Sequence, residues 1–365
     1  MIELNGSTPA LSSVIDRVLR AKRTIGPSYL EQVQQKSKLG RAGLKARLSL
    51  TNRLLLVVLL CRANKFGVVE GVGSAELRKL TGLSAHRLES QLFKLNAFGL
   101  IRSKIPGFSG SDFIGSKKTV YLLNLNHPDI VSTGSGSSVF VFESCTEFGG
   151  KSAAQLIFDL ADEGDFSSIL GLDNSAVFYE GFNDISSLFS GLSEERRKAV
   201  CGMLQFVVER CASHFLSHCL DRVVNGEVAY DGEFLAQVAS WVKDRSPSRF
   251  ARKFSGVSVQ VLICKFSQVL AGSVYSRLKR ISPRYLGAHE FFLVSAVPPE
   301  GAPGLSAVLA IEKEDSGGRC FRVADHWGFF DGWTDYICES SIPAEVRHEA
   351  GLMSTFSKYK RYADY

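Results

Sequence analysis

The chain has 365 residues, a length that favours two domains over one or three. Hydrophobic residues make up 45% of it, charged residues 22% and aromatic residues 10%, which is typical of a globular protein and excludes collagen-like, coiled-coil and disordered chains. The longest apolar run, residues 54–61, is far shorter than the roughly 20 residues that cross a bilayer, so we expect no membrane partner.

The first residues and the cysteines bear on the cellular compartment. Residues 1–5 carry an acid, Glu3, where a secretory signal carries basic residues, and no long apolar segment follows. The eight cysteines include no CxxC pair, and most stand in apolar runs such as 59–61 and 262–264. We therefore expect a cytoplasmic protein with reduced, buried thiols and no cofactor.

The charge is unevenly distributed along the chain. Residues 1–125 contain 20 Lys and Arg against 7 Asp and Glu, a net charge of +13, whereas residues 126–365 contain 23 against 30, a net charge of −7. A surface this basic attracts polyanions, and counterion release from nucleic acid is its usual source of affinity. The alternative is a solubility charge that happens to cluster in the first third.

A second basic segment, residues 243–284, contains ten basic side chains and one acid, Asp244. It predicts either a second basic patch, represented by Arg249, Arg252 and Lys253, or a set of ion pairs with the acids of 159–195. The sequence favours neither interpretation.

Periodicity and capping residues predict the elements of the first third in chain order: helices over 9–36, 49–65, 74–81 and 85–97, then strands at 100–104 and 119–123. The helix over 49–65, capped by Ser49 or Thr51, has an apolar body and is expected to be buried. Ser84 is expected to cap the helix over 85–97, and Gly99 follows its end. Glycine-rich segments at 67–73 and 106–118 predict a turn and a loop.

The order of these elements over residues 49–125 resembles the winged helix-turn-helix family. Its parts are a buried helix, a short helix, a tight turn, a longer helix ending in Gly-Leu-Ile-Arg (99–102) and a β-hairpin, and residues 92–102 are similar to the end of the recognition helix in MarR-like bacterial regulators. The hairpin loop departs from the family because it is long and serine-rich, with its basic pair late, at Lys117 and Lys118. The resemblance implies a winged helix that binds double-stranded DNA; the rest of the chain resembles no family.

The helix over 85–97 has an apolar stripe and a polar face. At 100° per residue, Leu88, Leu92 and Leu95 fall within about 60° of one another, and five side chains that can form hydrogen bonds lie on the other side. An α-helix enters the major groove with its N-terminal residues nearest the bases, where Arg pairs with guanine and Gln with adenine. The base-reading candidates are therefore Ser84, Arg87 and Gln91.

Other polar residues are expected to hold the DNA backbone. They come from the basic stretch at 36–47, from the two helices and from the hairpin: Arg41, Lys45, Arg47, Ser74, Arg78, Lys79, His86, Ser90, Lys94, Lys104, Lys117 and Lys118. The alternative is a winged helix that contacts protein through an ordinary solvated face, since the fold also serves that role. The charge of residues 1–125 favours DNA.

Residues 126–138 have linker composition, which predicts a basic winged-helix domain over 1–125 and a second domain over 139–365. Patterns in the second domain predict a strand at 139–143, helices over 151–163, 193–224, 232–243 and 257–281, and strands at 291–297, 306–312, 320–324 and 333–338. The expected fold class is α+β: an N-terminal winged helix-turn-helix domain followed by a mainly helical domain ending in a small antiparallel sheet.

A weak metal-binding pattern lies in the second domain. Cys211, His214 and His218 are spaced so that one helix face could present three zinc ligands. The same face carries apolar residues and has no fourth ligand nearby in sequence, so a buried stripe is the favoured interpretation and we expect no metal.

These features predict a sequence-specific transcriptional regulator that binds double-stranded DNA and is not an enzyme. Within DNA binding, the alternative is a replication or maintenance initiator of a mobile element. The alternative of another class is an enzyme with its catalytic domain in 139–365 and a DNA-targeting winged helix.

We also expect a homodimer, because one winged helix reads only a few base pairs. The helix over 257–278, with Val261, Phe266, Val269 and Leu270, is the favoured contact between copies, and the stripe of Val14, Ile15, Val18 and Leu19 is the other candidate. The role expected for residues 139–365 is dimerisation, sensing or partner contact, with a small-molecule or protein effector as a further partner.

Overall fold

The computed structural model describes residues 48–111, 115–127, 130, 137–143, 192–221, 238, 257–281, 289–295, 305–312, 320–326 and 329–353. Its helices are α3 (Leu50–Leu60), α4 (Ser74–Thr81), α5 (Ala85–Ala97), α8 (Glu194–His218), α11 (Val257–Ile281), the 3₁₀ turn η4 (Glu339–Ser341) and α12 (Ala344–Glu349). Its strands are β1 (Val68–Val69), β2 (Ile101–Ile105), β3 (Phe108–Ser111), β4 (Gly115–Lys117), β5 (Val120–Leu123), β6 (Ser138–Glu143), β7 (His289–Val294), β8 (Leu305–Glu312), β9 (Cys320–His326) and β10 (Phe329–Tyr336).

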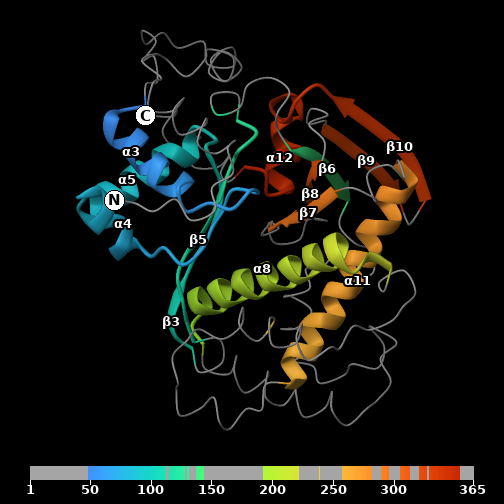
Figure 1. The fold of residues 1–365 in the computed structure, drawn as a ribbon, viewed down its shortest axis with the longest axis horizontal. Helices are drawn as coiled ribbons and strands as arrows, with labels where there is room; N and C mark the ends of the chain where they lie inside the picture. The colour runs from blue at the N-terminus through green and yellow to red at the C-terminus, as the bar shows by residue number, and fades with distance from the viewer. Residues whose placement is uncertain are drawn as a thin grey trace.

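The chain combines helices and sheets, as the expected α+β class requires. Helices α3, α4 and α5 lie on one side of β5, and the sheet that contains β6 lies on the other side (Figure 1). Within the described segments, no helix is both long enough and apolar enough to cross a membrane.

Polar side chains accept backbone hydrogen bonds at the start of helix α3 and just beyond its end. Ser49 is its cap, because the Ser49 hydroxyl accepts a hydrogen bond from the backbone N–H of Asn52 (3.2 Å). The helix ends at Leu60 rather than at residue 65. The reason is Asn64, whose side chain accepts from the backbone N–H groups of Phe66 and Val68 (both 3.0 Å) and closes a turn.

Helices α4 and α5 have the bounds that the sequence predicts. Helix α4 stops at Gly82, whose φ of +68° favours glycine. Ser84 caps α5 by accepting from the backbone N–H of Arg87 (3.4 Å). Both helices pack on α3, and Leu77 of α4 and Leu88 of α5 belong to one buried cluster with the α3 leucines. The helix pair is therefore held rigidly from beneath.

The sheet beside these helices has three antiparallel strands in the order β1-β5-β2. Strands β2 and β5 confirm the expected hairpin. Strand β1 lies in the segment 67–73, whose glycines predict a turn, and the expected loop over 106–118 contains a further hairpin, β3 paired with β4. Such short strands among glycine and serine carry no alternating apolar pattern, which is why the sequence does not reveal them.

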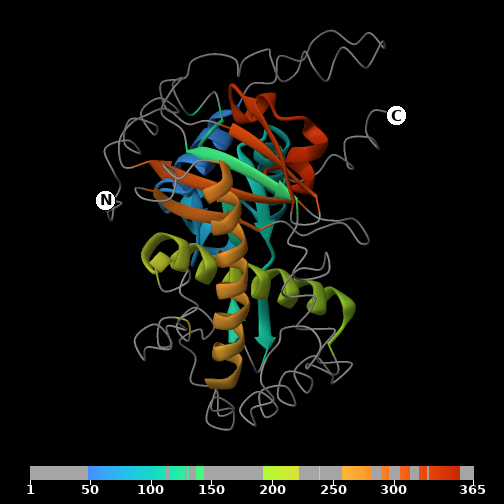
Figure 2. The same ribbon diagram turned by 90° about the vertical axis from the view of Figure 1, so that its right-hand side faces the viewer.

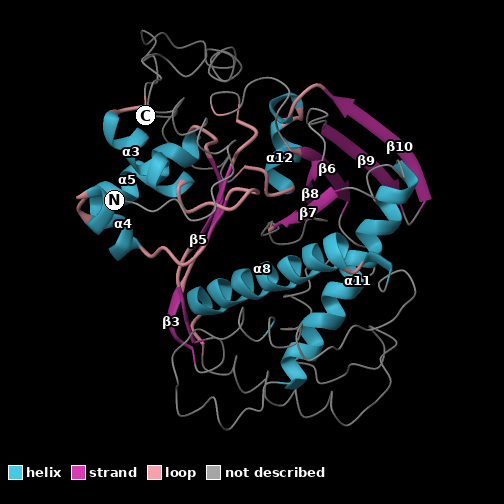
Figure 3. Ribbon diagram, in the orientation of Figure 1, coloured by secondary structure: helices cyan, strands magenta, loops and turns pink. Residues whose placement is uncertain are grey.

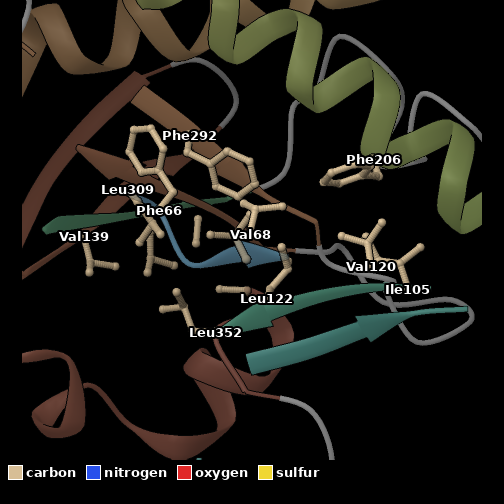
Figure 4. Packing of buried hydrophobic residues seen from close by; sticks show 14 of the residues in the cluster. Phe66, Val68, Ile105, Val120, Leu122, Val139, Phe206, Phe292, Leu309 and Leu352 are labelled. Atoms are coloured by element: carbon tan, nitrogen blue, oxygen red, sulfur yellow. The ribbon is translucent and has the colours of Figure 1, made fainter. Parts of the chain in front are cut away.

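Strand β5 is buried on both faces. Val120 and Leu122 belong to a cluster that includes Phe292 of β7, and Figure 4 shows their side chains on the face of the strand toward that ring. Tyr121 and Leu123 belong instead to the cluster of α3, α4 and α5. Successive side chains of a strand point to opposite faces, so this one strand joins two cores. The cluster that contains Val120 and Leu122 therefore includes residues from both sides of the expected linker.

The C-terminal part contains a five-stranded sheet in the order β10-β9-β6-β8-β7. Three of its pairings are antiparallel as expected, but β6 pairs with β9 in parallel, with Val139 opposite Cys320. This pair corrects the expectation of a purely antiparallel sheet. Strand β6 precedes the helices, and the long connection from 143 to 320 allows the chain to return in the same direction. Helices α8 and α11 pack together and cross (Figure 2).

The β7 edge of this sheet is closed by α8. The Ser217 hydroxyl accepts from the backbone N–H of Phe291, and the Ser213 hydroxyl accepts from that of Leu293, both at 2.9 Å. The two serines are four residues apart on a helix, and their partners are two residues apart on a strand. Both spacings correspond to about 6 to 7 Å, so each serine faces one outward N–H group of β7. This edge is thereby protected from pairing with another chain.

Glu209 lies on α8 one helical turn before Ser213. It is buried between α8 and the residue after β7, where it accepts hydrogen bonds from Gln205 (2.7 Å) and from the Ser295 hydroxyl. Burial raises the pKa of the Glu209 carboxyl to about 7, and the hydrogen bonds from Ser295 and Gln205 oppose this shift.

Arg102 of β2 and Glu339 of η4 form a buried ion pair between the N-terminal and C-terminal parts, with side chains only 2% and 3% exposed. The guanidinium contacts both carboxylate oxygens, one of them at 2.8 Å. The side-chain nitrogen of Asn126 donates to the Glu339 carboxylate (3.1 Å) and to the backbone carbonyl of Ser137 (3.0 Å). The side-chain oxygen of Asn126 accepts a hydrogen bond from the backbone N–H of Ser137 (2.9 Å). The two ends of the expected linker are therefore held together beside the ion pair.

Candidate nucleic-acid interface

Helix α5 presents a polar face away from the core. The three leucines of its apolar stripe are buried, as predicted. On the opposite side His86, Arg87 and Lys94 are exposed, and Ser90 is half-buried among them. The helix is thus oriented so that these side chains can meet a ligand.

Ser84 and Arg87 stand at the start of α5, the end of a helix that comes closest to bases in a major groove. The Ser84 oxygen is used to cap the helix, and its hydrogen can still be donated to a ligand. The Arg87 side chain is exposed and forms no ion pair with any residue that the structure describes. It can therefore offer a bidentate pair of donors to guanine.

Gln91 lies differently from the other two base-reading candidates. Its side chain is half-buried, and its carbonyl oxygen Oε1 is buried with no hydrogen-bond partner in the described residues. That oxygen is the atom that would accept from the amino group of adenine. A bidentate contact with adenine would therefore require Gln91 to change rotamer.

Exposed cations lie on α4, α5 and β2. Five of them form no ion pair within the described part of the chain, namely Arg78, Lys79, Arg87, Lys94 and Lys104. The acid of α4, Glu76, is engaged by Arg62 (3.4 Å) and Lys118 (3.6 Å), so it does not neutralise them. Glu89 is an exposed acid on α5. The surface as a whole keeps a positive potential that favours a polyanion.

The basic pair of the hairpin is partly engaged within the chain. Lys118 donates to the backbone carbonyl of Gly71 (2.8 Å) in addition to its ion pair with Glu76, so it ties the hairpin to the start of α4. Lys117 is half-buried and stands opposite Phe108 in the β3–β4 pairing. Ser74, the first residue of α4, is exposed.

The hairpin is also supported from below. Met203 and Phe206 of α8 pack in one cluster with Ile105 of β2, and a Cβ added at Gly202 would lie 3.7 Å from Ile105. Figure 3 shows the hairpin reaching the N-terminal end of α8. The hairpin is therefore a fixed part of the surface rather than an isolated arm.

Sequence reasoning did not select Phe93, which is 45% exposed on the outward side of α5. The signal was available, because Phe93 falls about 140° from Leu88 on the helical wheel, between the polar positions of that face.

Several expected residues lie outside the described residues. These are Arg41, Lys45 and Arg47 of the basic stretch, and Arg249, Arg252 and Lys253 of the second basic segment. Whether they join the surface of α4 and α5 stays a prediction.

The three weak metal-ligand candidates do not converge. Cys211 is fully buried, and burial together with the neighbouring Cys264 raises the pKa of its thiol above the ordinary value. His218 is exposed, and its ring centre lies 4.8 Å from that of His214. Among the described residues, no group of three His, Cys, Asp or Glu side chains is arranged to hold a metal ion.

No protein-family model, curated protein or solved structure matches this chain. The resemblance of residues 49–125 to winged helix-turn-helix proteins therefore stays a prediction from the sequence. Function is inferred from the exposed cations of α4 and α5 and from the packing that holds them in place.

Proposed function

We propose that the chain is a sequence-specific, double-stranded DNA-binding transcriptional regulator that places α5 in the major groove. The observation that carries the proposal is the outward face of α5, where exposed cations without an acidic partner in the described residues stand on a helix fixed by buried leucines. The element order α3-β1-α4-α5-β2-β5, with the strands arranged β1-β5-β2, supports a winged helix over residues 49–125.

The dimensions of α5 suit this role. Its 13 residues span about 20 Å, and the major groove, about 12 Å wide, admits one α-helix. Arg87 near its start would read guanine, and Ser84 would contact a neighbouring base or phosphate. Arg78, Lys79, Lys94 and Lys104 would bind phosphates and set the register without reading sequence.

The junction between the two parts supports regulation rather than simple DNA attachment. The turn after α5 leads directly into β2, which carries Arg102 and its ion pair to Glu339 in the C-terminal part. An effector that shifts η4 would therefore act on the strand that follows the recognition helix. A small molecule or a protein would serve as such an effector.

A homodimer remains part of the proposal, but not through the favoured face of α11. Phe266 and Leu270 are buried within the chain, where α11 packs on α8, so they are not available to a second copy. The other apolar stripe, over residues 14–19, lies outside the described residues. Sedimentation of the DNA complex tests this point: two copies per site support the regulator, and one copy on a long site favours the initiator.

The central experiment selects duplexes from a random pool with the full-length protein and then compares variants on the preferred site. Arg87→Ala should reduce the preference for that site by about 1 to 3 kcal/mol while nonspecific binding persists. Lys94→Ala should weaken all duplexes alike, and the four phosphate contacts of each copy predict a log–log salt slope of about −3.6 per bound copy. Arg62→Ala is the matched control, since Arg62 is engaged with Glu76. Absence of duplex binding at low salt would contradict the proposal.

A further inference from the structure

Phe93 differs from its neighbours in chemical character. It is a large apolar side chain, 45% exposed, on the face of α5 where His86 and Lys94 are exposed and Ser90 is half-buried. The core beneath α5 is complete without it, because the buried cluster takes Leu88, Leu92 and Leu95 from this helix and does not include Phe93.

The helical period places Phe93 on the outward side of α5. The three buried leucines define the inward direction of α5, and Phe93 lies about 50° from the opposite, outward direction. Arg87 lies about 70° from that direction on the other flank. A groove that receives this helix would meet Phe93 and Arg87 on either side of its centre.

The surroundings of Phe93 indicate the kind of partner. The cores of protein–protein interfaces are depleted of charged residues, whereas the exposed side chains near Phe93 on α5 include Lys94 and, one helical turn earlier, Glu89. A DNA major groove offers phosphates for the cations and base edges for the polar groups. Its apolar group is the C5-methyl of thymine, which Phe side chains contact in direct readout.

We propose that Phe93 is a specificity-determining residue that recognises a thymine of the preferred site through its C5-methyl group. The inference rests on the proposed DNA-binding function and adds a base identity to it. Arg87 and Phe93 then read guanine and thymine from opposite flanks of one helix, and Gln91, with its buried Oε1, is not needed for the readout.

The experiment uses the full-length protein and its selected duplex, in which each thymine is replaced in turn by uracil, the same base without the methyl. In wild type, one replacement should weaken binding about fourfold, the effect of withdrawing one methyl group from an apolar contact. In Phe93→Ala that penalty should disappear, since the partner of the methyl is gone. Phe93→Leu, which keeps an apolar side chain, should retain part of it.

Lys94→Ala is the matched control, because it should weaken thymine and uracil duplexes equally. An unchanged uracil penalty in Phe93→Ala would overturn the inference, as would the absence of a penalty at every thymine while Arg87→Ala still alters specificity. A change in the association state of Phe93→Ala, with its base preference intact, would also overturn it and assign Phe93 to a contact between copies. Failure of the wild-type protein to select any duplex would instead refute the proposed function itself.

Discussion

Glu209 and Glu339 are both buried and both join distant parts of the chain, but their surroundings differ. Glu339 faces the guanidinium of Arg102, which contacts both of its carboxylate oxygens. Glu209 faces an amide and a hydroxyl, and burial raises the pKa of its carboxyl to about 7. The buried charge of Glu339 is therefore balanced by a cation, whereas Glu209 is held by hydrogen bonds and takes up a proton near neutral pH.

The difference shows what each junction can do. A bidentate ion pair fixes both distance and orientation, so the Arg102–Glu339 junction holds β2, which follows α5, at a set orientation to the C-terminal part. A protonatable acid leaves the α8–β7 junction sensitive to pH. Four stability measurements on the full-length protein would test this contrast.

The largest effect is expected from Arg102→Ala. Because it leaves the Glu339 carboxylate buried with only Asn126 as a partner, it should lower the free energy of unfolding by about 3 to 5 kcal/mol in urea titrations. The double variant Arg102→Met with Glu339→Leu removes both charges and should recover most of the loss. A loss below about 1 kcal/mol, as expected for the exposed control Arg62→Ala, would show that the ion pair does not hold the junction.

The next effect is expected from Glu209→Gln and depends on pH. The folded pKa of about 7 lies above the ordinary value of 4.5, so wild-type stability is fullest below pH 4.5 and falls as pH rises toward 7. Glutamine keeps the shape without the charge and should gain up to about 3 kcal/mol relative to wild type between pH 4.5 and 8. Glu195→Gln, an exposed change on the same helix, should show no such trend. If the free energy of unfolding varied with pH in the same way for wild type, Glu209→Gln and Glu195→Gln, the raised pKa of Glu209 would be refuted.

A smaller effect is expected at Ser213 and Ser217, the two serines that bind the backbone of β7. Ser213→Ala leaves the backbone N–H of Leu293 buried without its acceptor and should cost about 1 to 3 kcal/mol, with faster hydrogen exchange at that amide. Ser217→Ala removes the equivalent bond to Phe291 at a less buried position and should cost less. Equal costs at the two positions would mean that burial does not set the strength of these contacts.

The smallest effect is expected from the exposed ion pairs between the two parts. Arg210 pairs with Glu70, and Lys65 pairs with Glu290, all of them partly exposed. Glu70→Gln should change stability by less than about 1 kcal/mol, and the change should vanish in 1 M salt. A cost that rivals that of Arg102→Ala would show that the surface pairs, rather than the buried one, join the two parts.

The parts of the fold that local signals determine were predictable. Helices α4, α5 and α11 and the caps at Ser49 and Ser84 follow from periodicity and short-range hydrogen bonding. Strand β1 and the β3–β4 hairpin were not, because their pairing depends on partners elsewhere and their sequences are short and rich in glycine. The parallel pairing of β6 with β9 likewise has no local signal.

The candidate site shows the same division. The outward face of α5 follows from the helical period, and its leucine stripe is buried as predicted. The buried Oε1 of Gln91 depends on neighbours that the period does not specify, whereas the outward position of Phe93 follows from the period itself. The pairing of Arg102 with Glu339 spans 237 positions of sequence, beyond the reach of any motif.

The double burial of β5 has a consequence for biosynthesis. One of its faces packs against residues as late in the chain as Leu352, so that face is not fully covered until most of the protein has been made. At about 5 to 20 residues per second, the 229 residues from Leu123 to Leu352 take about 10 to 45 s to emerge. During that interval the nascent N-terminal part exposes an apolar strand surface, which makes it a natural substrate for chaperones that bind extended hydrophobic segments.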